Sequence, residues 1–206
     1  MMDIKICGMT NRININEIAL LPIRWMGFVF YAGSVRDASG VTPEDVLRVP
    51  GTISKTGVFV NAGEDEILCK AEKLSLKTIQ LHGEESPDYC KRMRERGFEI
   101  IKALPVRDVA DIKAAEKYKG SCDYLLFDTK SPERGGTGNK FNWNILDSYN
   151  QDTPFLLSGG ISGQDAEIIK NMNYDKMAGV DLNSRFESEP GIKDVERLKR
   201  FISVIV

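Results

Sequence analysis

Eight short apolar segments alternate with longer amphipathic segments along the chain. The apolar segments are typical of buried strands, and the segments between them repeat apolar residues at helical spacing, as in Glu64–Leu74. This alternation predicts a parallel sheet. The predicted strands are Asp3–Ile6, part of Ile23–Tyr31, Lys55–Val60, Thr78–Leu81, Glu99–Ala103, Asp123–Phe127, Phe155–Ser158 and Met177–Leu182.

The predicted helices fill the intervals and have recognisable ends. Pro43 suits a first helical position, and Gly97 suits a helix C-cap. The helices are Ile13–Leu21, one that begins at Thr42–Glu44, Glu64–Leu74, one through Tyr89 and Met93, Arg107–Tyr118, Trp143–Leu146, Gln164–Asn171 and Ile192–Val206. Eight such units predict an α/β fold, a single (β/α)8 TIM barrel over residues 1–206. This fold typically needs about 250 residues, so we expect a compact version without an added domain.

Charge and composition argue against several kinds of binding partner. The net charge is -2, from 28 basic and 30 acidic residues, which gives no electrostatic reason to expect nucleic acid or an anionic membrane. No apolar run approaches the length of a membrane span and no secretory signal precedes the first strand, so we expect a cytoplasmic protein. Four cysteines without CxxC spacing and a lone histidine, His82, argue against a metal site. We expect Cys69, Cys90 and Cys122 to be reduced and packed as small hydrophobic residues.

Reactive side chains follow the predicted strands directly. Catalysis in such barrels occurs at the C-terminal ends of the strands, where Cys7, Asp128 and the pair Gly159-Gly160 stand. Taken alone, Cys7 is more often a packing residue, and Asp128 either caps a turn or faces a site. Glycines before a helix let backbone N–H groups approach an anion. Together, a thiol, a carboxylate and a phosphate cradle indicate acid/base chemistry on a phosphorylated small molecule.

Several sequence blocks resemble the phosphoribosylanthranilate isomerase family, over nearly the whole chain. They are Lys5-Ile6-Cys7-Gly8-Met9-Thr10, Gly27–Tyr31 with Ser34 and Arg36, Gly57–Asn61, Gln80-Leu81-His82-Gly83, Phe127-Asp128, Gly135–Gly138, Gly159-Gly160 and Gly179-Val180-Asp181. The first block and the Gln80–Gly83 block are specific, whereas the glycine pairs alone are not.

The resemblance implies an intramolecular oxidoreductase, an aldose–ketose isomerase of tryptophan biosynthesis. Its reaction is the Amadori rearrangement of N-(5-phosphoribosyl)anthranilate to 1-(2-carboxyphenylamino)-1-deoxyribulose 5-phosphate. The resemblance makes Asp128 the general acid, Cys7 the general base, and Arg36 the partner of the anthranilate carboxylate. It implies no cofactor, a small phosphoribosyl substrate, and a monomer or a homodimer. The remaining residues expected to bind the substrate are Gly159, Gly160, Asp181, Ser184 and Arg185.

The two catalytic roles make opposite demands on the site. A base must be a thiolate, so we expect the site to lower the pKa of Cys7. An acid must hold its proton near neutrality, so we expect desolvation to raise the pKa of Asp128.

Other residues near the strand ends are interpreted as structural or as supporting the site. For His82, together with Gln80, a structural or site-supporting role is favoured over proton transfer. Lys102 is interpreted as part of a structural or substrate-orienting ion pair rather than a Schiff-base lysine. The glycine-rich segment Arg134–Gly138 is either a mobile lid or a plain connection.

The segment after the last predicted strand departs from the family pattern, which is of the type Val-Ser-Ser-Gly-Val-Glu. Here Arg185 stands at the glycine and Phe186 at a small aliphatic residue, while Ser184 and Glu187 match. A glycine at such a turn often supplies positive φ, which costs a residue with a side chain about 1 kcal/mol or more. Either Arg185 makes a charged phosphate contact in place of backbone donors, or the loop is remodelled and binds phosphate weakly. Gly33 and Val35 also replace expected prolines.

Three rival functions remain open at this stage. A metal-dependent pentose-phosphate epimerase conflicts with the single histidine. A synthase that closes the indole ring would give no reason for the block around Cys7. A non-catalytic phosphosugar-binding relative would fit the altered loop after the last strand, but not the presence of both Cys7 and Asp128. A broader substrate range, toward the imidazole-containing aminoaldose of histidine synthesis, also stays open.

Overall fold

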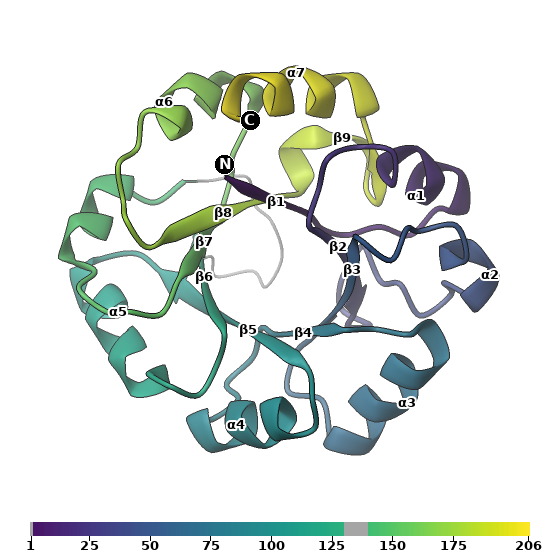
Figure 1. Cartoon of the computed structure of the whole chain (residues 1–206), viewed down its shortest axis with the longest axis horizontal. Helices are drawn as coiled ribbons and strands as arrows, with labels where there is room; N and C mark the ends of the chain where they lie inside the picture. The colour runs from purple at the N-terminus through teal and green to yellow at the C-terminus, as the bar shows by residue number, and fades with distance from the viewer. Residues whose placement is uncertain (1, 130–139) are drawn as a thin grey trace.

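A closed barrel of parallel strands forms the centre of the molecule (Figure 1). The computed structural model describes residues 2–129 and 140–206. Within these ranges each barrel strand pairs with the next along the chain, and β8 pairs with β1, which closes the barrel. The strands are β1 (Asp3–Ile6), β2 (Trp25–Phe30), β3 (Ser54–Phe59), β4 (Thr78–Leu81), β5 (Glu99–Val106), β6 (Tyr124–Thr129), β7 (Phe155–Leu157) and β8 (Met177–Leu182). The predicted α/β barrel is therefore confirmed.

A ring of short helices surrounds the barrel (Figure 1). They are α1 (Arg12–Ile18), α2 (Pro43–Val46), α3 (Glu64–Leu74), α4 (Pro87–Glu95), α5 (Val109–Ala114), α6 (Ala166–Lys170) and α7 (Val195–Ile205), with the 3-10 helices η1 (Ala115–Tyr118), η2 (Trp143–Ser148), η3 (Gly163–Asp165) and η4 (Ser184–Phe186). The small size of the protein is reached by shortening helices, because α2 and α6 span four and five residues. None of the helices in the described ranges is long and apolar enough to cross a membrane.

Two differences from the sequence-based expectation concern the end of the chain. The predicted helix Ile192–Val206 begins only at Val195, because the Asp194 side chain accepts a hydrogen bond from the Arg197 N–H and caps it. The residues before it form a small antiparallel hairpin of β9 (Glu187–Glu189) and β10 (Ile192–Lys193), which the sequence pattern did not predict. This hairpin carries two charged residues of the site described below.

Apolar side chains cover the outer face of the barrel wall and part of its inner face. Outward-facing residues pack under the helices in one large cluster, while a smaller cluster lies inside the barrel and consists of Trp25, Ile101, Ala103, Leu126 and Leu156. Cys90 and Cys122 are buried as expected. The expectation for Cys69 is wrong: its thiol is exposed, because this position of α3 faces away from the barrel.

Candidate functional site

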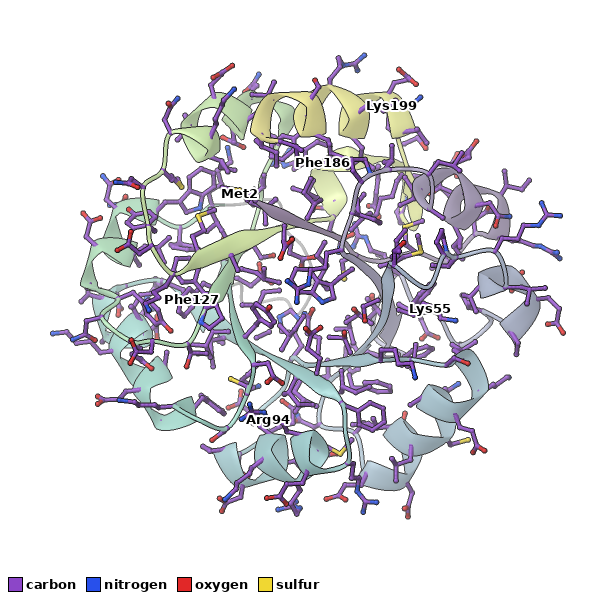
Figure 2. All side chains as sticks on the ribbon, in the orientation of Figure 1. Met2, Lys55, Arg94, Phe127, Phe186 and Lys199 are labelled. Atoms are coloured by element: carbon purple, nitrogen blue, oxygen red, sulfur yellow. The ribbon has the colours of Figure 1, made fainter. Side chains whose placement is uncertain are left out.

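The C-terminal ends of the strands bring the predicted site residues to one rim of the barrel. Cys7 follows β1, Asp128 lies near the end of β6, and Gly159 and Gly160 follow β7. Arg36 lies in the connection after β2, next to the isolated bridge between Val29 and Asp37. Figure 2 shows many nitrogen- and oxygen-bearing side-chain ends gathered inside the barrel. This interior polarity contrasts with the apolar wall and marks the site.

Cys7 is buried and held by backbone hydrogen bonds to the neighbouring strands. Its N–H donates to the Leu182 carbonyl at 3.0 Å, and the next N–H, of Gly8, donates to the Gly27 carbonyl at 3.0 Å. Gly8 has φ +80°, and a Cβ there would lie 2.6 Å from Arg36 Cδ and 2.8 Å from Asn183 Oδ1. Only glycine fits this position. Because Gly8 has no side chain, the Arg36 side chain can pass directly over its backbone, next to Cys7.

A buried ion pair lies next to the Cys7 thiol. Lys5 Nζ is 2.8 Å from Asp181 Oδ1, and Ser158 Oγ donates to Asp181 Oδ2 at 3.4 Å. A Cβ on Gly27 would lie 2.8 Å from Cys7 Sγ and 3.2 Å from Lys5 Nζ, so the thiol and the ammonium border the same space. Asp181 thus has Lys5 and Ser158 as its partners, and its expected contact with substrate stays a prediction.

The protonation of Cys7 departs from the sequence-based expectation. Burial raises the pKa of the Cys7 thiol, and the positive charge of Lys5 only partly offsets it. The Asp181 carboxylate also raises this pKa, because it disfavours a second negative charge nearby. The predicted lowering is therefore wrong for the free protein: the sequence showed neither the depth of the thiol nor the acid that engages Lys5.

Asp128 is the partly exposed carboxylate on the opposite wall. Its Oδ1 accepts a hydrogen bond from the Thr129 N–H at 2.9 Å, and its Oδ2 lies 3.5 Å from His82 Nε2. The other ring nitrogen of His82 is 3.3 Å from Gln80 Nε2. The end of β4 thus contacts the carboxylate through His82, as a site-supporting residue would.

Lys102 forms a structural ion pair. Its buried Nζ is 2.8 Å from Glu85 Oε2 and donates to the carbonyls of Leu81 and Gly83 at 3.1 and 2.7 Å. Glu85 in turn accepts hydrogen bonds from the Asn61 and Gly83 N–H groups. The structural interpretation of Lys102 is the one that this geometry supports, because its donors fix the loop that follows His82.

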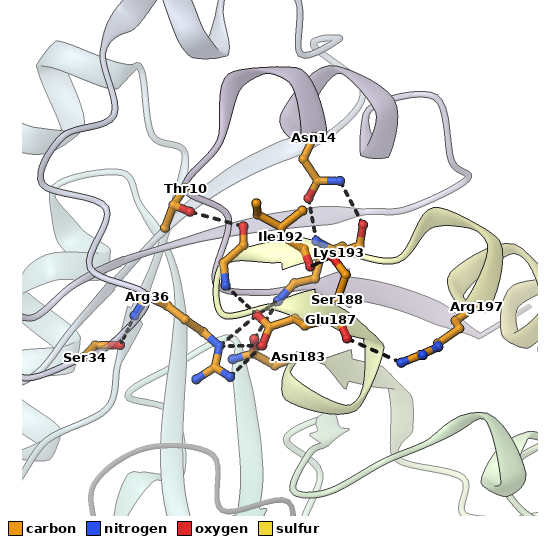
Figure 3. A network of polar contacts seen from close by, with 11 residues as sticks. Thr10, Asn14, Ser34, Arg36, Asn183, Glu187, Ser188, Ile192, Lys193 and Arg197 are labelled. Carbon is orange, nitrogen blue, oxygen red and sulfur yellow. Dashed lines mark hydrogen bonds and ion pairs between the residues drawn. The ribbon is translucent and has the colours of Figure 1, made fainter.

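Arg36 is part of a polar network that joins the connection after β2 to the β9–β10 hairpin (Figure 3). Its guanidinium binds both oxygens of Glu187, with Nε to Oε1 at 2.8 Å and Nη2 to Oε2 at 2.6 Å. Lys193 Nζ binds Glu187 Oε1 at 2.5 Å and Asn183 Oδ1 at 2.7 Å. Sequence reasoning missed Lys193 and Asn183, because no motif signal distinguished them.

The connection after β7 has the backbone form of an anion cradle. Gly159 and Gly160 have φ values of +90° and +66°, and a Cβ on Gly159 would lie 2.2 Å from Thr129 Oγ1. Gly160 and Arg185 both line a cavity of about 700 Å³, together with Lys140, Ser162, Gly163, Gln164, Arg197, Arg200, Phe201 and Val204. The structure thus brings Arg185 close to the predicted phosphate cradle.

The altered segment after β8 folds without the backbone strain that its sequence suggested. Arg185 lies in η4, and it is not among the described residues with positive φ. Phe186 is buried against Phe201 in an edge-to-face pair, with ring centroids 5.1 Å apart. The cost expected for a side chain at this turn does not arise, because the loop forms a 3-10 turn anchored by an aromatic contact. The possible lid Arg134–Gly138 lies outside the described residues.

Sequence comparisons match nearly the whole chain to one enzyme family. The family model described as N-(5'phosphoribosyl)anthranilate (PRA) isomerase matches residues 4–204. An N-(5'-phosphoribosyl)anthranilate isomerase of Parabacteroides distasonis is 45% identical, over 100% of this chain and 94% of that protein. One from Phocaeicola vulgatus is 41% identical, over 98% of this chain and 97% of that protein.

Solved structures give the same result. The phosphoribosyl anthranilate isomerase of Thermotoga maritima superposes with a TM-score of 0.83 at 33% identity, covering 100% of this chain and 98% of that one. A complex of such an isomerase with reduced 1-(o-carboxyphenylamino)-1-deoxyribulose 5-phosphate superposes with a TM-score of 0.79 at 30% identity, over 100% and 98% of the two chains. From sequence, barrel and rim together, the chain belongs to the N-(5'-phosphoribosyl)anthranilate isomerase family.

Proposed function

We infer that the chain is an isomerase of tryptophan biosynthesis that converts N-(5-phosphoribosyl)anthranilate to 1-(2-carboxyphenylamino)-1-deoxyribulose 5-phosphate, and we propose Asp128 and Cys7 as its acid and base. Family membership over residues 4–204 carries the reaction. The thiol and the carboxylate on facing strand ends of one rim support the assignment of the two roles. The reaction is an isomerisation, so every proton that leaves the substrate must return to it or to water.

In the first step, the Asp128 carboxyl protonates the ribose ring oxygen, the C1–O bond breaks, and the nitrogen lone pair forms a Schiff base. The exposure of Asp128 to the mouth of the barrel suits contact with a ligand. His82, 3.5 Å from Oδ2, helps to orient the carboxyl. The proposed acid therefore has a fixed position without being sealed off from substrate.

In the second step, Cys7 takes the proton from C2 and the electrons of that bond form the enolamine. Tautomerisation of the enolamine to the ketone completes the rearrangement. A thiolate is the basic form, and Lys5 is the main cation that stabilises it beside the buried sulfur, with a smaller contribution from Lys193. Lys5 thus acts through Cys7 and needs no contact with substrate.

The two ends of the substrate are proposed to bind on either side of these groups. The 5-phosphate is bound by the backbone at Gly159 and Gly160, by Ser184, and by the charge of Arg185, in line with the cavity wall that Gly160 and Arg185 share. The anthranilate carboxylate is bound by Arg36, whose side chain crosses Gly8 beside Cys7. Anchoring both ends holds C1 and C2 between the acid and the base.

We propose further that residues 1–206 form one catalytic domain that works in the cytoplasm without a cofactor. A solved structure from Thermotoga maritima is of generated monomers of a dimeric phosphoribosylanthranilate isomerase, so a homodimer is one of the two proposed states, next to a monomer. Neither nucleic acid nor a membrane has a role in this proposal.

Turnover tests the function directly. Purified protein is added to phosphoribosylanthranilate, and loss of substrate fluorescence is followed while the product is identified by mass. Rearrangement to the ketone supports the proposal. A folded protein that binds the reduced product analogue but gives no turnover would instead indicate a phosphosugar-binding relative without catalysis.

A further inference from the structure

The network around Arg36 contains an unbalanced positive charge. Arg36 and Lys193 are cations, and Glu187 is the single carboxylate that both of them bind (Figure 3). The side chains of Arg36, Glu187 and Lys193 are 10%, 5% and 0% exposed. The remaining contacts of the group come from neutral donors and acceptors, the Gly191 N–H and the Asn183 amide oxygen. One buried positive charge is therefore left without a carboxylate among the described residues.

Burial of an unbalanced charge is costly, and Lys193 shows the effect. The pKa of the Lys193 ammonium is lowered, because burial outweighs the raising effects of Glu187 and of the Cys7 thiol, and the neighbouring Arg36 charge lowers it further. The carboxylates next to Lys193 and Arg36 in sequence do not supply the missing anion, because Asp194 is paired with Arg197 at 2.9 Å and Asp37 accepts a hydrogen bond from Ser39 Oγ at 2.6 Å. The free network is thus prepared for a ligand that brings one negative charge.

The geometry of Arg36 leaves one edge of its guanidinium for that ligand. Glu187 engages Nε and Nη2, whereas Nη1 takes part in none of the hydrogen bonds between described residues. The end formed by Nη1 and Nη2 has the spacing of a carboxylate, which guanidinium groups bind through two parallel hydrogen bonds. Glu187 thereby fixes the plane of the guanidinium, and Lys193 fixes Glu187.

We propose that Glu187 and Lys193 are positioning residues for Arg36, and that Lys193 prevents Glu187 from neutralising Arg36, so that the site selects a substrate with a carboxylate on its aromatic ring. This rests on the proposed binding of anthranilate by Arg36. The new element is the source of the selectivity, which is the net positive charge of Arg36, Glu187 and Lys193 taken together. Arg36 belongs to the connection after β2, and the other two belong to the β9–β10 hairpin. Without Lys193, Arg36 and Glu187 would form a neutral pair with little need of another anion.

The test compares two ligands on each protein. Affinities are measured by calorimetry for the reduced product analogue and for the same compound with a carboxamide in place of the carboxylate. The variant Lys193→Gln removes the charge but keeps a donor toward Glu187, and Lys193→Met serves as a second variant. Lys199→Met is the matched control, because it removes an exposed lysine paired with Glu196 on α7.

We expect the wild type and Lys199→Met to prefer the carboxylate by at least tenfold, which is about 1.4 kcal/mol. In the Lys193 variants that preference should fall by about tenfold, while affinity for the carboxamide stays within about threefold and reports an intact phosphate end. An unchanged preference in variants that still bind the carboxamide overturns the proposal. Equal binding of both compounds by the wild type also overturns it, without any variant. Failure of the proposed function looks different, because it shows as absent turnover of phosphoribosylanthranilate by the wild type, whichever of the two compounds binds.

Discussion

The influence of Lys5 on the Cys7 thiol gives the sharpest test of the catalytic assignment. Sγ and Nζ lie within 2.8 and 3.2 Å of one point above Gly27, hence no more than about 6 Å apart. At that separation and an effective dielectric constant near 20, opposite unit charges attract by about 3 kcal/mol. Lys5→Met should therefore reduce the thiolate fraction at neutral pH roughly 100-fold. Because nucleophilicity rises with thiol basicity, alkylation should slow by only about tenfold.

The assay is the rate of alkylation by iodoacetamide, read by mass spectrometry in a Cys69→Ser background that removes the exposed thiol. Two buried thiols stay protonated, since burial raises the pKa of Cys90 to about 11 and that of Cys122 to about 12. A Cys7→Ala variant identifies the signal that belongs to Cys7.

A double variant separates thiol chemistry from folding. Lys5→Met leaves Asp181 buried and unpaired, which costs about 3–5 kcal/mol of unfolding free energy. Lys5→Met/Asp181→Asn removes both charges and should recover most of that stability. Its alkylation should nevertheless stay slower than in the wild type, because the charge of Lys5, which lowers the pKa of the thiol more than that of Lys193 does, is gone. Wild-type alkylation in the double variant would refute the electrostatic role of Lys5.

Three further outcomes follow from the packing and charge of the rim. Phe186→Ala should lower the unfolding free energy by about 3–5 kcal/mol, seen as a fall in Tm of roughly 6–20 °C; a loss below about 1 kcal/mol would contradict its role as anchor of the last loop. Gly159→Ala should raise KM and lower Tm because its Cβ would collide with Thr129, whereas Gly51→Ala, which meets nothing within 4 Å and lies before β3, should change neither. Burial opposes ionisation of Glu187, but Arg36 and Lys193 hold its pKa below the ordinary 4.5. The stability that the ionised carboxylate contributes is therefore fully present above pH 4.5. It is lost as the pH falls from 4.5 toward the lower pKa of the folded state. Urea unfolding across that range checks this, and a Glu187→Gln variant should show a weaker decline in acid.

Local sequence was enough to predict the barrel and the rim, because strand-end position follows from hydrophobic pattern alone. Cys7, Asp128 and Gly159 could be found in this way, each directly after an apolar segment. The binding of Arg36 by Glu187 could not, since it joins residues far apart in the chain through a hairpin too short to leave a strand pattern.

One wrong expectation, for Cys7, and one question left open, for Arg185, depend on features that only the fold defines. The raised pKa of Cys7 depends on the depth of the thiol and on the Asp181 carboxylate beside Lys5, which only the folded barrel defines. The ease with which Arg185 replaces glycine depends on η4, whose backbone avoids positive φ. In both cases the expectation came from the family's sequence pattern, which does not include the surrounding three-dimensional structure.

The most direct measurement of the acid/base assignment is single-turnover rearrangement by Cys7→Ala and Asp128→Ala, beside wild type and a Cys69→Ala control. The catalytic variants should lose about 100-fold or more in rate, as expected for removal of a general acid or base, while the reduced product analogue binds within about threefold of wild type. The control, which changes an exposed thiol, should match the wild type. A Cys7→Ala or Asp128→Ala protein that binds the analogue and turns over at the wild-type rate would contradict the assignment.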